Sequence, residues 1–99
     1  MHSANAFSIR PATEADAYVL RKLADLDGHA SVSLPALIGE IDGTAAAAMS
    51  LQDGRIVADP FQHTARLSAL LIMRFRAMRS FARAQFERRR RSEPIRFAA

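Results

Sequence analysis

The sequence predicts an α+β domain in which an antiparallel β-meander and an N-terminal strand are packed by two helices. Two Asp-Gly pairs divide residues 37–58 into three short, largely apolar runs, which is typical of strands joined by tight turns. A capped amphipathic segment precedes these runs, over residues 13–26, and a long segment without Gly or Pro follows them, over residues 64–87. The chain has 99 residues, which is the length of one domain.

The N-terminal part predicts one strand followed by one helix. Residues 7–9 alternate between apolar and polar side chains, which indicates a short strand, and Pro11 ends it. Thr13 is expected to be the N-cap of the helix, with Asp16 as its capping-box partner three residues later. The helix is expected to run to about residue 26, and Gly28 suits a left-handed C-cap. Its predicted buried face consists of Val19, Leu20, Leu23 and Leu26.

The middle of the chain predicts three antiparallel strands, over residues 37–41, 44–51 and 55–58. Asp42-Gly43 and Asp53-Gly54 are the expected two-residue turns, with both glycines at positive φ. By propensity alone, the four consecutive alanines of the second run also fit a helix. As a strand, this run would place Ala45, Ala47, Met49 and Leu51 on one face, and its small side chains would let the long helix pack closely.

The long C-terminal segment predicts an amphipathic helix over residues 64–87, which the first sixty residues are expected to cover. Arg74 falls inside its apolar stripe and is expected to snorkel, to pair with a carboxylate such as Glu40, or to face a partner subunit. Ile72 and Met73 lie beside the stripe, which favours a dimer or larger complex. The stripe comprises Leu67, Leu70, Leu71, Arg74, Met78, Phe81, Ala82 and Gln85, with Arg76, Arg79, Ser80 and Arg83 on the other side.

Charge divides the chain into two parts. Residues 1–60 carry four basic and eight acidic side chains, a net charge of −4, whereas residues 61–99 carry ten basic and two acidic ones, a net charge of +8. The arginine run at 88–91 repels itself, so we expect residues 1–87 to form the domain and residues 88–99 a basic, disordered tail. No apolar run approaches the ~20 residues that span a bilayer, and a cytoplasmic protein is expected.

Several kinds of site are excluded by residue type. The chain has no cysteine, which rules out disulfides, thiolate zinc sites and a cysteine nucleophile. His2, His29 and His63 do not have the spacing of metal ligands, so no metal is expected.

The order strand, helix, three-strand meander, long helix resembles the GNAT acetyltransferase superfamily. The stretch SIRPATEADAYVLRKLADLD is similar to the family's first strand and helix, and ALIGEIDGTAAAAMSLQDGRIVADPF resembles its second to fourth strands. The resemblance covers about residues 7–86 and implies a shortened GNAT-like fold, because the chain ends before the family's fifth strand and last helix.

The resemblance also implies where a cofactor and a base would lie. The family binds the pyrophosphate of acetyl-CoA with a loop of the form Arg/Gln-x-x-Gly-x-Gly/Ala, and here that place has no glycine and contains Pro60, which lacks a backbone donor. The N-terminus of the long helix can still bind phosphate without a glycine. The alternative is that the residues there only cap the helix. Asp59 and Glu40 are the candidate bases, although Asp59 also suits a turn. The candidate acetyl-CoA residues are Gln62, His63, Thr64, Ala65 and Arg66.

These departures favour a degenerate, non-catalytic GNAT-like domain that requires no cofactor and acts through self-association or a protein partner. One alternative is an acyl-CoA-dependent N-acyltransferase, using acetyl-CoA, that is completed by oligomerisation. Another is a nucleic-acid binder that uses Arg76, Arg79 and Arg83 on the helix together with the tail. The same arginines also fit a solvated helix face, because no aromatic platform or DNA-reading motif accompanies them.

Overall fold

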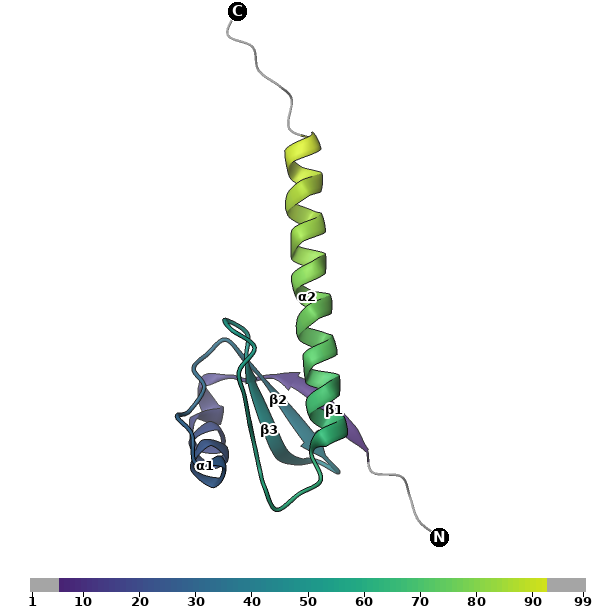
Figure 1. Cartoon of the computed structure of the whole chain (residues 1–99). Helices are drawn as coiled ribbons and strands as arrows, with labels where there is room; N and C mark the ends of the chain where they lie inside the picture. Colours follow the sequence, from purple (N-terminus) through teal and green to yellow (C-terminus); the bar gives the residue numbers. More distant parts are fainter. Residues whose placement is uncertain (1–5, 93–99) are drawn as a thin grey trace, which may run out of the picture.

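The computed structural model describes residues 6–92 and shows a four-stranded antiparallel sheet with one helix on each face (Figure 1). The strands lie in chain order, β1-β2-β3-β4. This confirms the predicted α+β class. The elements are β1 (Phe7–Pro11), a 3-10 turn (Glu14–Asp16), α1 (Ala17–Asp27), β2 (Ala36–Ile41), β3 (Thr44–Ser50), β4 (Ile56–Ala58) and α2 (Ala65–Ser92).

Helix α1 ends at the predicted Gly28 cap, but the residues after Thr13 first form the 3-10 turn, so the α-helix itself starts at Ala17, later than predicted. The backbone N–H of Thr13 donates to the Asp16 carboxylate at 2.8 Å, which is one half of the expected capping box. Gly28 adopts the left-handed conformation, with φ 71°, and its N–H donates to the last-turn carbonyls. Leu20 and Leu23 are buried against the sheet together with Ala24, and the other two predicted core residues of α1 are half-buried.

The two hairpin turns differ in length. Asp42 and Gly43 both have positive φ, 50° and 83°, which confirms the predicted two-residue turn between β2 and β3. Gly54 also has positive φ, 76°, as predicted. However, the Ser50 N–H donates to the Arg55 carbonyl at 2.8 Å, so the β3–β4 connection is a four-residue loop and the predicted two-residue turn is wrong there.

Strand β3 is extended, as predicted, but it contains one extra residue that shifts its pairing register with β2. Gly39 and Glu40 of β2 pair with Ala47 and Ala45 of β3, so Ala46 is an extra residue and forms a β-bulge. Ala45 therefore packs on the α1 side, while Ala47 and Met49 pack on the side of α2. The prediction that Ala45 shares the face of Met49 is wrong, because one inserted residue reverses the alternation.

Helix α2 packs on the sheet only through its first three turns. Leu67 and Leu71 are fully buried, and Phe75 is half-buried beside them. At Gly39 the helix lies so close that an added Cβ would be 2.8 Å from a Leu67 methyl carbon. The alanines of β3 and this glycine therefore provide the close approach that the sequence predicts.

Beyond Phe75 the helix leaves the sheet, and residues 76–90 are all exposed (Figure 1). The first sixty residues thus cover only the beginning of the predicted stripe. The helix also continues to Ser92 instead of ending at Glu87, so residues 88–92 are helical and not part of a disordered tail. The rest of the predicted tail, residues 93–99, lies outside the described residues. We call residues 76–92 the arm.

None of the helices between residues 6 and 92 has both the length and the apolarity needed to cross a membrane.

Candidate functional site

The predicted cofactor loop is an exposed turn that leads into α2. The side-chain carboxylate of Asp59 accepts the Phe61 N–H at 2.9 Å, and its carbonyl accepts the Gln62 N–H at 3.2 Å. The Thr64 carbonyl accepts the Ser68 N–H at 2.7 Å, in the first turn of α2. Two loop donors are therefore occupied by Asp59 itself, and the negative charge of its carboxylate in this loop disfavours a bound anion.

The five candidate cofactor residues lie next to one another on this turn and the first turn of α2. Four of them are exposed and Thr64 is half-buried; they are Gln62, His63, Thr64, Ala65 and Arg66.

The two candidate bases, Asp59 and Glu40, form hydrogen bonds in different parts of the fold. Asp59 follows β4 and serves the turn just described, whereas Glu40 lies on β2. The Glu40 carboxylate accepts the Ser8 hydroxyl at 3.1 Å and the Arg10 Nε–H at 3.2 Å. Asp59 and Glu40 share no hydrogen-bond partner among the described residues, so the structure does not bring them together as an acid–base pair.

A three-residue ionic network joins β1, β2 and the start of α1. The guanidinium of Arg10 donates two hydrogen bonds to Asp16, at 2.8 and 2.9 Å, and a third to Glu40. These bonds hold the pKa of the Asp16 carboxyl well below its ordinary value and raise the pKa of Arg10. Glu40 thus pairs with Arg10 and not with Arg74, which is exposed on α2. Sequence reasoning missed this network, although it identified Asp16 as a capping residue.

A concave surface lies between α2 and the β3–β4 loop. It is a half-open groove of about 740 Å³, with Phe75 and Ala82 on its apolar side and Gly54 at the loop. The three predicted nucleic-acid-binding residues also line it: Arg76, Arg79 and Arg83. They are exposed, and the Arg79 guanidinium lies 5.5 Å from the Phe75 ring centroid.

The groove is electropositive. Asp53 is the one carboxylate among the groove-lining residues, and its side chain accepts the Arg55 backbone N–H at 2.9 Å. This hydrogen bond lowers the pKa of Asp53, which keeps it ionised. The groove is still lined by three guanidinium groups and only one carboxylate, so it favours ligands that carry negative charge.

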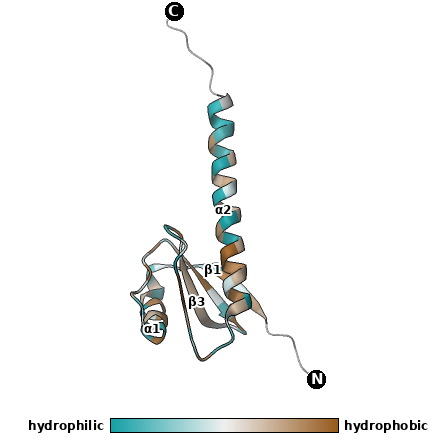
Figure 2. Cartoon of the chain, viewed as in Figure 1, coloured by the Kyte–Doolittle hydropathy of each residue, from teal (hydrophilic) through white to brown (hydrophobic). Residues whose placement is uncertain are grey.

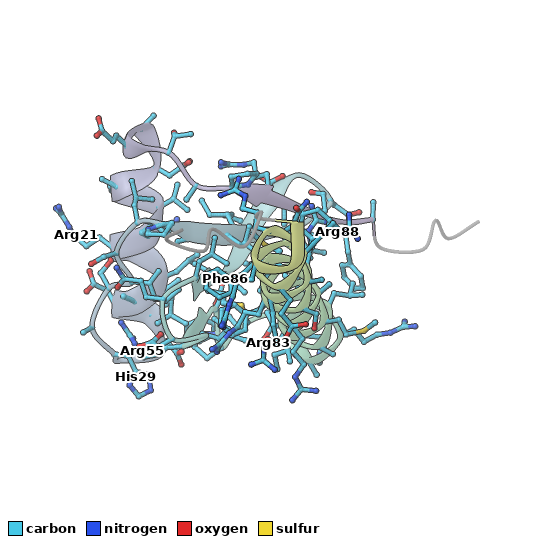
Figure 3. The ribbon with its side chains drawn as sticks, turned by 90° about the horizontal axis from the view of Figure 1, so that it is seen from above. Arg21, His29, Arg55, Arg83, Phe86 and Arg88 are labelled. Atoms are coloured by element: carbon cyan, nitrogen blue, oxygen red, sulfur yellow. The ribbon has the colours of Figure 1, made fainter. Side chains whose placement is uncertain are left out.

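Above the groove, the arm exposes large apolar side chains between its arginines (Figure 2). Phe81 is 66% exposed, Phe86 is 62% exposed and Met78 is 41% exposed. Seen down the helix, Phe86 and Arg88 point to different sides of the arm (Figure 3). Sequence reasoning placed Met78 and Phe81 in the apolar stripe but did not identify them as uncovered, and it did not single out Phe86.

No protein-family model, curated protein or solved structure matches this chain. Within residues 6–92, no group of three or more histidine, aspartate and glutamate side chains could hold a metal ion.

Proposed function

We propose that this chain is a cytoplasmic, non-catalytic interaction module that acts through self-association or a protein partner, with the arm as its binding element. The observation that carries the proposal is the arm itself: an ordered helix whose residues 76–90 are all exposed, although it carries two phenylalanines and a methionine. A helix of a small domain ordinarily buries one face, and exposed apolar patches of this kind mark interaction sites.

We further propose that the module has a degenerate, shortened GNAT-like fold. Its support is the order of elements: a strand, a helix, a three-strand meander and a long helix. The non-catalytic reading is supported by the loop before α2, where Pro60 offers no N–H and Asp59 takes the N–H groups of Phe61 and Gln62. Acetyl-CoA is therefore not a required cofactor in this proposal.

The test is calorimetric titration with acetyl-CoA beside sedimentation equilibrium of the full chain. We expect no heat of binding at micromolar acetyl-CoA. If the arm mediates self-association, Phe81→Asp with Phe86→Asp should abolish the concentration-dependent mass, whereas Tyr18→Asp should not. Tyr18 is a suitable control because it is 71% exposed and lies on α1, away from the arm. A monomer that binds no acetyl-CoA leaves the protein-partner form of the proposal.

The enzyme alternative makes the opposite prediction for the same titration. Micromolar binding of acetyl-CoA that is lost when Thr64 or Arg66 is substituted would overturn the non-catalytic proposal. It would favour an N-acyltransferase, and a dimer in the sedimentation run would then indicate completion by a second subunit.

Nucleic-acid binding is the second candidate function. The specific observation for it is a set of exposed arginines along α2. Arg76, Arg79 and Arg83 form no ion pair within the described residues, and the arginine run continues to the end of α2. Binding to a DNA duplex should then weaken with salt, with a logarithmic slope of roughly −0.9 for each phosphate contacted. Binding that is insensitive to salt would exclude this function.

A further inference from the structure

The apolar seam that anchors α2 continues along the arm. Leu67, Leu71 and Phe75 recur every four residues and contact the sheet. The same helical side carries Ala82 and Phe86 beyond the sheet, because positions three, four and seven residues apart share a face. Figure 3 shows Phe86 on the side of the helix towards the sheet and α1. The uncovered part of the seam therefore lies on the same side of α2 as the sheet and α1.

This position restricts the shape of whatever covers the seam. The sheet and α1 project from the same side of α2 that carries the seam (Figure 1). A flat membrane laid along the arm would meet the body of the protein before it reached the apolar side chains. A narrow, elongated element fits instead, with one end in the groove between Phe75, Ala82 and the β3–β4 loop. A single helix has this shape, since its diameter is about 10 Å.

The charge of the groove restricts the composition of that helix. Arg79 and Arg83 line the groove and form no ion pair within residues 6–92. A helix that fills the groove would lie beside both guanidinium groups, so carboxylates on its flanks are favoured and basic residues are disfavoured.

A second copy of this chain fits the surface poorly. The arm has seven arginines and one glutamate, a net charge of +6, so two arms side by side repel each other. Arg79 and Arg83 also line the groove next to Phe75 and Ala82 of the seam. Pairing two arms would bring these like charges to the contact. Acidic residues on a different chain would instead neutralise them.

We infer that the arm and its groove bind an acidic amphipathic helix of another protein, which lays its apolar face along Ala82 and Phe86 and its carboxylates against Arg79 and Arg83. This inference rests on the proposed function and names the chemistry of the partner. The mode is that of a helix in a groove, with apolar anchors spaced at three and four residues and a charged rim that selects the partner.

The test uses a synthetic helical peptide of about 20 residues, roughly the 25–30 Å length of the arm. It has leucine at alternating third and fourth positions and glutamate on both flanks. Two matched peptides carry glutamine or lysine in place of every glutamate. Fluorescence anisotropy with the full chain should show binding of the glutamate peptide and at least about tenfold weaker binding of the other two, as expected for loss of two or more charge pairs.

Protein variants locate the contact. Arg79→Glu with Arg83→Glu should weaken binding of the glutamate peptide by about tenfold or more and strengthen binding of the lysine peptide. Arg21→Glu with Lys22→Glu changes the net charge equally on exposed α1 residues and should change neither affinity by more than about twofold. Phe86→Asp should weaken the glutamate peptide, whereas Phe61→Asp, an exposed change outside the arm, should not.

Each contrary result overturns a defined part of the reasoning. No binding of the glutamate peptide at about 100 μM, or equal binding of the glutamine peptide, rejects the acidic helical partner. Arm-dependent dimerisation in the sedimentation run rejects it in favour of a second copy but leaves the proposed function standing. Salt-dependent binding of a DNA duplex that outcompetes the peptide indicates nucleic acid instead. Micromolar binding of acetyl-CoA rejects the proposed function itself.

Discussion

Substitution of Gly39 by alanine tests the close approach of α2 to the sheet. Gly39 lies in β2 opposite the bulge of β3, and an alanine Cβ there would be 2.8, 2.9 and 3.0 Å from three side-chain carbons of Leu67. Ordinary carbon–carbon contacts are about 3.5–4.0 Å, so α2 or the Leu67 side chain must move by about half an ångström or more. Leu67 is fully buried, which limits how far its side chain can turn away.

The expected cost follows from two opposing effects. Overpacking a filled core costs about 1–3 kcal/mol, whereas replacing a strand glycine by alanine gains about 0.5–1 kcal/mol from the backbone. The net destabilisation of Gly39→Ala should therefore lie between about 0 and 2.5 kcal/mol, with a central value of about 1 kcal/mol. For a domain of this size, each kcal/mol corresponds to a shift in Tm of about 4–8 °C.

A double-mutant cycle with Leu67→Ala isolates the contact. Leu67→Ala alone should destabilise by about 2–5 kcal/mol, because it leaves a cavity beneath α2. In that background the extra methyl group of Gly39→Ala enters empty space, so its effect should become neutral or stabilising. The free energies of unfolding are measured by urea denaturation followed by circular dichroism. A Gly39→Ala variant that is equally destabilising in both backgrounds, or stabilising in the wild type, would refute the close packing.

Four further variants test other parts of the fold. Gly43→Val should destabilise by more than about 1 kcal/mol, and Gly54→Val by at least as much, because both glycines have positive φ and Gly54 also lies against Phe75; equal stability to wild type in urea melts would contradict this. The pKa of Asp16 is lowered from its ordinary 3.8, chiefly by Arg10, so its stabilising effect is present above that pH and is lost as the pH falls through and below it. Asp16→Asn should remove this acid-side dependence from a pH series of urea melts, and an unchanged slope would exclude the network as its source. Deletion of residues 88–99 should change the free energy of unfolding by less than about 0.5 kcal/mol, since residues 88–90 are exposed, and a larger loss would show that the helix end is packed.

The sequence signals that succeeded are local ones. The Asp42-Gly43 turn, the Gly28 cap and the N-cap at Thr13 each depend on a few neighbouring residues, and the structure contains all three. The meander follows from these turns and from alternating apolar residues, which is why the fold class could be predicted.

The features that were missed depend on contacts between distant residues. The bulge at Ala46 arises from the pairing of β3 with β2, and no residue of β3 signals it alone. The Arg10 network joins residues from two strands and a turn, up to 30 positions apart. For the candidate site, the sequence indicated an amphipathic helix with a basic side. It did not indicate that the sheet stops covering this helix at Phe75, because the apolar spacing continues past that residue without a break.

The arm remains helical without a packed face, and the reason bears on its function. Its base is already fixed by Leu67 and Leu71, so the arm extends an existing helix and avoids the cost of nucleation. Alanine, arginine and methionine favour the helix, and the Arg90 guanidinium lies 5.9 Å from the Phe86 ring centroid one turn away.

A helix formed in advance loses little conformational entropy when a partner binds, which favours affinity from a modest contact area. The arginines at 88–91 repel one another at the end of the arm, and a partner that carries carboxylates would relieve that repulsion while it covers the apolar seam. Salt screens both effects. Binding of the glutamate peptide should therefore weaken as salt rises from about 50 to 500 mM, while the affinity that comes from the seam persists.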